Sequence, residues 1–450
     1  MGRPASKSNL PRAVLVVCDS LRADLIGPDS TPRLFQLGAE SCRFENHRSV
    51  FPSTTRTASA SIATGCLPRN HGLLGNVVAL DEGRGLAPVS TGRADYRDRI
   101  RAVTGRVLTR PTLAQRIAES PLTGRVGAVI FSNATPGAAH VQDPDGHGYL
   151  YNRAGSHGPG LRPLPSAQHL DTPKGIEGDA AVTDRFVEEA LLGGEAALSV
   201  LWLSEPDFTG HAHPLGGPEH RLAIAAADAC VGRVAEAVER LDPGGERVIL
   251  MVTSDHGQET TRRVIHVESL LVEAGLKAAP DSTDIVPTSQ GTAAVFYAAA
   301  SARERIPALL DFLQGQHWAK TVYAGATLRE VGLDSQGLDN REVAYRGTVR
   351  GSVLAAAVSM AKSDAKNAYG IAGLSDIMFE EGGINNPGRG QHGGLGAYEQ
   401  SPFLFIRGGG FPSGAAIARP TSCIDLAPTI LAHLGQPSGG MDGGILMDLL

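Results

Sequence analysis

Six aspartate and histidine residues stand directly after short apolar runs or inside glycine-rich loops, places where a protein core has no need of them. Carboxylates and imidazoles in the absence of thiolates favour zinc or a similar divalent ion. Taken singly, an aspartate after a strand is more often a turn residue or a helix cap, so only the whole set indicates a metal site. The set provides three protein ligands for each of two ions and leaves each ion an open position for substrate. Its members are Asp19, Asp207, His211, Asp255, His256 and His392.

Hydroxyl residues precede a stretch of small residues that predicts a helix beginning near Thr55. Free backbone N–H groups and the positive end of the helix dipole favour a phosphate at a helix N-terminus. A hydroxyl at this position could therefore attack a bound phosphorus group. The competing explanation is ordinary capping of the helix by serine or threonine, and the residues alone leave it open.

Short, β-branched apolar runs without alternation predict strands that are buried on both faces of a parallel sheet. Helical patterns between them predict helices on both faces of this sheet, which is the α/β class. The polar residues just after the strands then lie at the edge where such sheets bind ligands. Pro206 and Gly210 disfavour a regular helix around Asp207 and His211, so we expect a shaped loop there. The expected strands are residues 13–18, 126–131, 198–203, 248–253 and 403–406, and the expected helices are residues 32–40, 111–119, 219–241 and 424–434.

Three stretches interrupt this rhythm of strands and helices. Residues 77–110 and 133–175 are rich in Gly, Pro and Arg, and predict long loops over one face. Residues 276–390 carry a pattern of their own, with strands at 293–298 and 320–324, a helix at 302–313 and a further apolar run at 353–359. We therefore expect a metal-binding catalytic α/β domain of residues 1–275 plus 391–450, and a small inserted α+β cap of residues 276–390.

The overall composition excludes several classes of protein. The 450 residues carry 41 Lys and Arg against 47 Asp and Glu, a net charge of −6, which argues against a partner that is a nucleic acid polymer. No apolar run approaches the roughly 18 residues of a membrane span. The N-terminus has no apolar segment typical of a signal peptide, so we expect a cytoplasmic protein. The five cysteines are scattered and form no disulfide framework, and the oligomeric state is not determined.

Several short motifs follow one another along most of the chain, as far as residues 425–429. They are residues 15–24 (LVVCDSLRAD), 51–55 (FPSTT), 62–65 (IATG), 71–76 (HGLLGN), 204–211 (SEPDFTGH), 254–257 (SDHG) and 391–393 (QHG). In this order they resemble the nucleotide pyrophosphatase/phosphodiesterases, or type I phosphodiesterases, of the alkaline phosphatase superfamily. The resemblance implies an alkaline-phosphatase-like fold, with a central mostly parallel sheet that is flanked by helices and carries the inserted cap.

The same resemblance implies a role for each candidate residue. It assigns Thr55 as the nucleophile and as a further metal ligand, and Asn76 as the donor to a non-bridging phosphoryl oxygen. The expected reaction is hydrolysis of a phosphodiester or pyrophosphate through a phospho-threonine intermediate, with two zinc ions that activate Thr55 and stabilise the leaving oxygen. One zinc ion is assigned to Asp207, His211 and His392, and the other to Asp19, Asp255 and His256.

One position departs from the family pattern. Members that cleave nucleotides usually follow the nucleophile with an aromatic residue that stacks on the base, whereas this chain has Arg56. An arginine fork suits a carboxylate or a second phosphate, so we expect a small anionic phosphorus-containing substrate with another anionic group, unless Arg56 turns away to pair with an acidic loop residue. A C–P hydrolase resembling phosphonoacetate hydrolase or a phosphomonoesterase on the same site is the alternative. An inactive metal-binding sensor is the alternative from another class.

Overall fold

The computed structural model describes residues 10–120, 127–334 and 353–450. In this part of the chain the main sheet has ten strands in the order β21-β2-β20-β11-β1-β10-β6-β7-β8-β9. The middle of the sheet is parallel, because β1 pairs in parallel with β10 and β11, and β10 with β6. The bounds are β1 Arg12–Cys18, β2 Cys42–Phe44, β6 Ala128–Ser132, β7 Tyr149–Tyr151, β8 His157–Gly158, β9 Arg162–Pro163, β10 Leu198–Leu203, β11 Val248–Thr253, β20 Leu404–Arg407 and β21 Ala416–Ile417.

Helices cover both faces of this sheet, and the side chains of β1 show why. Leu15 and Val17 pack into one apolar cluster, while Val14 and Val16 pack into another on the opposite face. A strand buried on both faces reads as a continuous apolar run, as the sequence predicted. The first face is covered by α2 (Thr55–Thr64), α5 (Leu113–Ala118), α6 (Pro136–His140) and α12 (Leu426–His433), and the second by α1 (Pro32–Glu40), α7 (Ile176–Arg185) and α9 (Pro218–Leu241).

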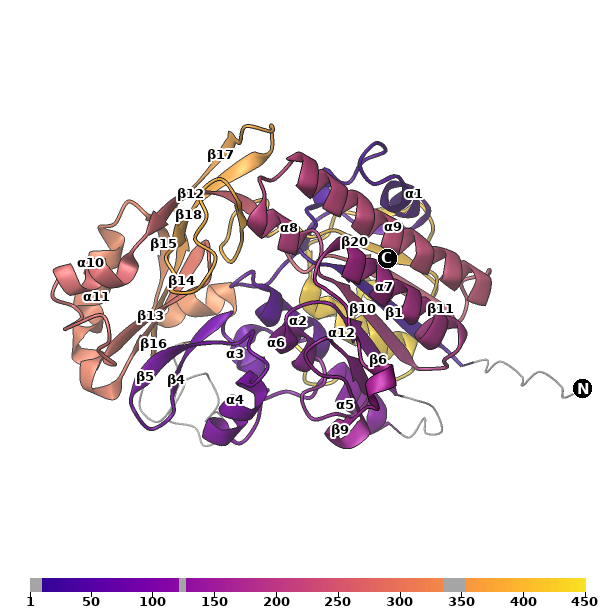
Figure 1. Cartoon of the computed structure of the whole chain (residues 1–450), viewed down its shortest axis with the longest axis horizontal. Helices are drawn as coiled ribbons and strands as arrows, with labels where there is room; N and C mark the ends of the chain where they lie inside the picture. Colours follow the sequence, from indigo (N-terminus) through magenta and orange to yellow (C-terminus); the bar gives the residue numbers. More distant parts are fainter. Residues whose placement is uncertain (1–9, 121–126, 335–352) are drawn as a thin grey trace, which may run out of the picture.

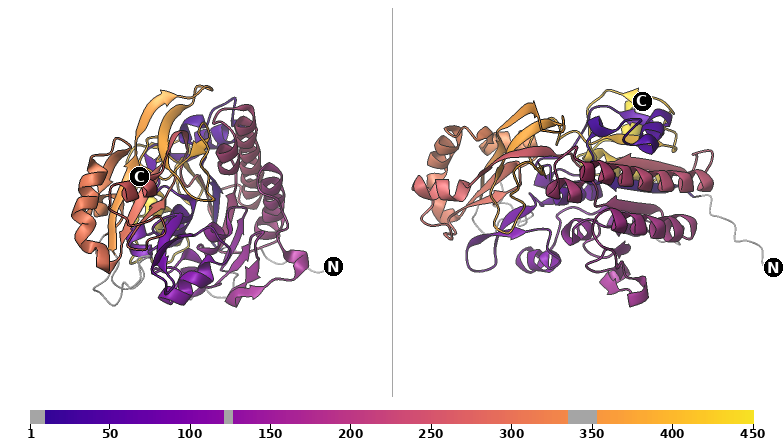
Figure 2. Two further views of the ribbon diagram at one scale, coloured as in Figure 1. Left: turned by 60° about the vertical axis from the view of Figure 1, so that its left-hand side comes forward. Right: turned by 45° about the horizontal axis from the view of Figure 1, so that its top comes forward.

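A second lobe lies beside the main sheet and contains two further four-stranded sheets (Figures 1 and 2). Their orders are β17-β18-β12-β19 and β13-β14-β16-β15, and α10 (Val267–Glu273) and α11 (Ile306–Gln314) share an apolar core with the second of them. The predicted division into a catalytic domain and a cap stays a prediction. The strand bounds are β12 Glu259–Ile265, β13 Ile285–Ser289, β14 Ala293–Ala298, β15 Ala319–Tyr323, β16 Val353–Met360, β17 Lys362–Lys366, β18 Ala372–Met378 and β19 Gly390–Gln391.

The expectation of one long loop over residues 77–110 is wrong. This stretch forms a hairpin of β4 (Val77–Asp81) and β5 (Leu86–Ser90), followed by α4 (Tyr96–Thr104). Its turn is closed by Asp81, whose Oδ1 accepts hydrogen bonds of 2.8 and 2.9 Å from the N–H groups of Gly83 and Gly85. Both glycines have positive φ angles. The glycine-rich composition that suggested a long loop therefore belongs to a tight turn between two strands.

The predicted fold class is confirmed as α/β, with a large mostly parallel sheet flanked by helices. The helix expected at residues 32–40 forms over those residues, and β10 and β11 span residues 198–203 and 248–253 as expected. All five cysteines are buried as free thiols. Among the described helices, none combines the length and apolar character that crossing a bilayer requires.

Candidate active site

Three aspartates meet at one edge of the main sheet because they follow three neighbouring parallel strands. Asp19 comes directly after β1, Asp207 comes shortly after β10, and Asp255 comes shortly after β11. The carboxyl ends of parallel strands lie on the same edge, so the three carboxylates converge there. The backbone N–H of Asp207 donates to the carbonyl oxygen of Asp19 at 3.1 Å and ties two of these loops together.

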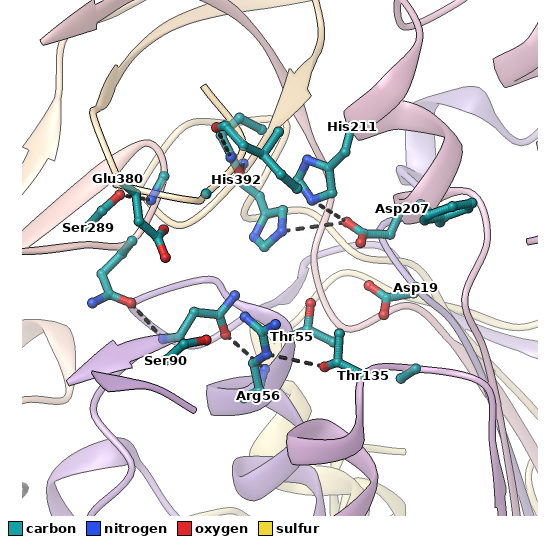
Figure 3. A pocket seen from close by; sticks show the side chains of 18 of the residues that line it. Asp19, Thr55, Arg56, Ser90, Thr135, Asp207, His211, Ser289, Glu380 and His392 are labelled. Atoms are coloured by element: carbon teal, nitrogen blue, oxygen red, sulfur yellow. Dashed lines mark hydrogen bonds and ion pairs between the residues drawn. The ribbon is translucent and has the colours of Figure 1, made fainter. Parts of the chain in front are cut away.

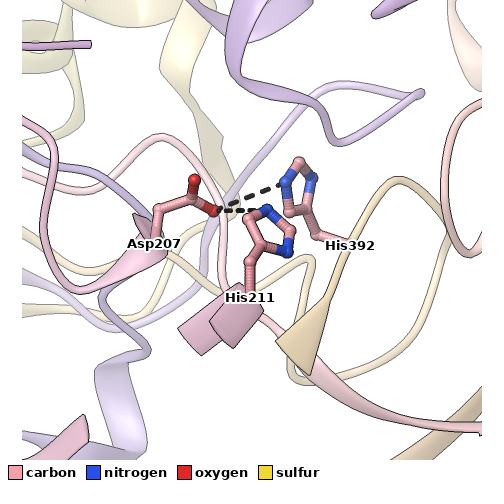
Figure 4. A group of neighbouring side chains, drawn as sticks. All are labelled: Asp207, His211 and His392. Atoms are coloured by element: carbon pink, nitrogen blue, oxygen red, sulfur yellow. Dashed lines mark ion pairs between the residues drawn. The ribbon is translucent and has the colours of Figure 1, made fainter. Parts of the chain in front are cut away.

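The first candidate metal group is Asp207, His211 and His392 (Figure 4). Asp207 Oδ1 lies 3.2 Å from His211 Nε2 and 3.5 Å from His392 Nε2. The prediction of a shaped loop here is wrong, because residues 207–212 form the short helix α8 (Asp207–Ala212). Pro206 precedes the first helical residue, where a missing N–H costs nothing, and one glycine costs only about 1 kcal/mol.

The second candidate metal group is Asp19, Asp255 and His256, all of which are buried. His256 Nε2 lies 3.0 Å from Asp255 Oδ2 and 3.8 Å from Asp19 Oδ1. The rings of His256 and His392 stack with centroids 3.9 Å apart, so the two groups adjoin. The six residues chosen from the sequence are thus brought together as two sets of three.

Each histidine of the pair that reaches Asp207 is oriented by a backbone carbonyl group. His392 Nδ1 donates to the oxygen of Ser53 and His211 Nδ1 to the oxygen of Gly390, both at 2.9 Å. Each carbonyl group accepts a proton from Nδ1, and the ring then directs Nε2 toward the carboxylate of Asp207.

The second group fits a cation equally well. His256 Nδ1 donates to the carbonyl oxygen of Gly257 at 3.1 Å, which turns its Nε2 toward Asp255 Oδ2. Asp19 Oδ1 is buried and accepts no hydrogen bond from any residue that the structure describes. Burial, and then the neighbouring Asp255 and Asp207, raise the pKa of Asp19 well above its usual value. Acceptors turned toward one another in a buried site form a donor set for a divalent ion.

Thr55 and Asn76 lie beside these groups. Thr55 is the first residue of α2, as predicted, and its Oγ1 lies 3.2 Å from His256 Nε2. Asn76 Oδ1 accepts a hydrogen bond of 3.2 Å from the backbone N–H of Arg56, so the amide Nδ2 remains as a donor. Its own N–H donates to Gln290 Oε1 at 2.7 Å, which fixes the loop that carries it.

A cavity of about 490 Å³ opens beside both groups, and its lining includes charged side chains that the sequence only partly predicted (Figure 3). Arg56 does line it, with Nε donating to Thr135 Oγ1 at 3.2 Å, and forms no ion pair with a described residue. Lys174 and Glu380 also line the cavity and were missed. No spacing relates them to the metal motifs, because Lys174 lies in a loop before α7 and Glu380 just after β18.

A buried ion cluster from the second lobe supports the loop of His392. Glu399 accepts hydrogen bonds from the N–H groups of Gly394 at 3.0 Å and Gly396 at 2.8 Å. Lys362 of β17 lies 2.5 Å from Glu399 Oε1 and 3.6 Å from Glu259 Oε2. Burial and the neighbouring Glu399 raise the pKa of Glu259, while Lys362 lowers it. The lysine thus offsets part of the charge of two carboxylates beneath the loop that presents His392.

Comparison with known proteins agrees with this geometry. A family model described as type I phosphodiesterase / nucleotide pyrophosphatase matches residues 13–318. The chain belongs to this family. The members of this family are phosphodiesterases and pyrophosphatases, which act on small phosphorus-containing substrates.

Two solved structures of murine ectonucleotide pyrophosphatase/phosphodiesterase 5 share the fold of this chain. One is an inactive variant in complex with AMP, with 18% identity, and the other has 19% identity. Each alignment has a TM-score of 0.65 and covers 98% of this chain and 100% of the murine chain. No curated protein matches the sequence significantly.

Substitution of a ligand should empty one metal site. Asp207→Asn and Asp255→Asn should each lower the metal content of the purified protein by about one ion per chain, because each removes a carboxylate from a different group of three. Elemental analysis of protein purified without chelator measures this change. Asp364→Asn, at an exposed position of β17, is the control. Metal content that is equal in all three variants would contradict the assignment.

Removal of the lysine beneath the His392 loop should destabilise the fold. Lys362→Met leaves Glu399 and Glu259 buried without their counter-charge, so the free energy of unfolding should fall by about 3–5 kcal/mol. Denaturant titration followed by circular dichroism measures it. Lys366→Met lies on the same strand but is exposed, and should change the value by less than about 0.5 kcal/mol. A similar small loss for both variants would refute the role of Lys362.

Proposed function

We propose that this protein is a two-metal hydrolase that cleaves phosphodiester or pyrophosphate bonds through a phospho-threonine intermediate. The observation that carries the proposal is the position of the Thr55 hydroxyl at the start of α2, 3.2 Å from His256 and beside both groups of three ligands. Thr55 would be the nucleophile. Asp207, His211 and His392 would hold one ion, and Asp19, Asp255, His256 and Thr55 the other, with zinc as the expected metal.

In the proposed reaction Thr55 Oγ1 forms a bond to phosphorus while the bond to the leaving oxygen breaks on the opposite side. Asn76 donates through Nδ2 to a non-bridging oxygen, which gains charge in the transition state. Zinc ions, when bound, supply the positive charge that lowers the pKa of the attacking hydroxyl and stabilises the leaving oxygen. Water then hydrolyses the phospho-threonine and restores the Thr55 hydroxyl.

The alternatives use the same residues in different ways. A C–P hydrolase or a phosphomonoesterase would keep Thr55 and both ligand groups but accept a different leaving group. An inactive metal-binding sensor would have lost Thr55 or a ligand, and this chain retains all of them. Turnover of a bis-aryl phosphodiester, an aryl phosphomonoester and phosphonoacetate, measured side by side, separates the enzymatic alternatives.

Replacement of the nucleophile should abolish turnover but preserve the fold. Thr55→Ala should lower kcat by about 10³-fold or more on the preferred substrate, while Thr55→Ser keeps partial activity. Rapid acid quench followed by peptide mass spectrometry should find the transferred phosphoryl group on Thr55 in the wild type, still carrying the substituent that did not leave. Thr64→Ala, at the far end of the same helix, is the matched control. A wild-type rate for Thr55→Ala would mean that the nucleophile is another group.

Loss of the amide donor should slow the chemical step. Asn76→Ala should lower kcat by about 10²–10³-fold, the usual loss for one oxyanion donor. Steady-state kinetics measures this, with elemental analysis as a check that metal content is unchanged. A change of less than about threefold would show that Asn76 serves only to shape its loop.

A further inference from the structure

Lys174 is held at the cavity wall by the loop that follows it. Gly175 has a φ angle of 90°, and its N–H donates to Ser204 Oγ at 3.0 Å. A Cβ at Gly175 would lie 3.3 Å from the ring of Phe208, so a side chain there would be both strained and crowded. Asp179 completes the anchor, because its carboxylate accepts from the N–H groups of Ser204 and Glu205, each at 2.9 Å.

The ammonium group of Lys174 has no neutralising partner of its own. It forms no hydrogen bond or ion pair with any residue in the described part of the chain, and lies 5.5 Å from the centroid of the Phe208 ring. Burial lowers its pKa, and the carboxylates that act on it, Asp207 and Asp19, are both candidate metal ligands. With cations bound to those carboxylates, Lys174 faces the cavity as an uncompensated charge.

Arg56 contributes a second cation to the same cavity. Its guanidinium group passes so close to Gly92 that a Cβ there would lie 2.3 Å from Nη2. Among the residues that the structure describes, Thr135 is the hydrogen-bond partner of the guanidinium group, through Nε, and neither Nη atom has one. The carboxylate of Glu380 also lines the cavity. Burial raises the pKa of Glu380, and the nearby Arg56 lowers it. Among the described residues that line the cavity, two cations therefore stand against one carboxylate outside the candidate metal groups.

The size of the cavity limits what can reach both cations. A volume of about 490 Å³ suits one small molecule, and the lining includes Thr55, Arg56 and Lys174 together. A molecule whose phosphorus group lies at Thr55 can thus place another group at the cations. Arginine and lysine recognise carboxylate and phosphate oxygens by charged hydrogen bonds.

We propose that Arg56 and Lys174 form a second anion subsite, and that the substrate carries a carboxylate or a further phosphate a short linker away from the scissile phosphorus. This inference rests on the proposed function, because it places the scissile group at Thr55. It adds Lys174 as a specificity residue and defines the substrate class as doubly anionic small molecules.

The test compares two substrates that differ by one charge: 4-nitrophenyl carboxymethyl phosphate and its methyl ester. The wild type should favour the free carboxylate by about tenfold or more in kcat/KM, and Lys174→Gln and Arg56→Gln should each lower this ratio by about tenfold, near 1.4 kcal/mol. Lys174→Arg, which retains the charge, should keep most of the ratio. Lys366→Gln, an exposed lysine outside the cavity, should change neither rate.

Calorimetry provides a readout that does not need turnover. In the Thr55→Ala background loaded with zinc, the free carboxylate should bind about tenfold more tightly than its methyl ester, and Lys174→Gln should remove this preference. Hydrolysis of both esters at equal kcat/KM, or a ratio unchanged by Lys174→Gln, would overturn the subsite and leave the proposed function standing. Selective binding without hydrolysis of either ester would overturn the proposed function and support the subsite.

Discussion

Mutual repulsion of three carboxylates is the constraint around which this site is built. Asp19, Asp207 and Asp255 converge because neighbouring parallel strands end at the same edge of the sheet. Burial makes each negative charge costly, and the raised pKa of Asp19 is the direct consequence. Hydrogen bonds offset part of the cost: Ser20 N–H donates to Asp255 at 3.1 Å, and the indole N–H of Trp202 donates to Asp19 at 3.1 Å. The remainder calls for cations, which is why the site fits metals.

The second lobe completes the site from the opposite side. His392 lies beyond β19, in a loop that Glu399 and Lys362 hold from below, and its Nδ1 is fixed by the carbonyl group of Ser53. Ser53, two residues before α2, and the loop that follows β19 therefore meet at one histidine. Because the position of this candidate metal ligand depends on contacts between segments far apart in the chain, unfolding of the second lobe would displace it from the candidate site.

The cavity lining contains charges of both signs. The candidate metal groups contain carboxylates, whereas Arg56 and Lys174 bring cations to the lining and Glu380 brings a further carboxylate. Phe208 is an aromatic side chain of the lining, and Lys174 lies over its ring. The proposed anion subsite would make recognition in this cavity depend on these charges, so the proposal favours a compact substrate with two anionic groups.

Much of the fold and the candidate site was contained in the sequence. Buried strands such as β1 are apolar on both faces, so their runs are visible without a structure, and metal ligands are residue types with few other uses at strand ends. Composition gave wrong predictions in two places. In residues 77–110 a carboxylate closes a glycine-rich turn between two strands, and at α8 the proline lies just before the first helical residue. Only the tertiary structure brought Lys174, Glu380 and Lys362 to the site. Their roles depend on which distant charges face them, and a pattern along the chain does not record distances in space.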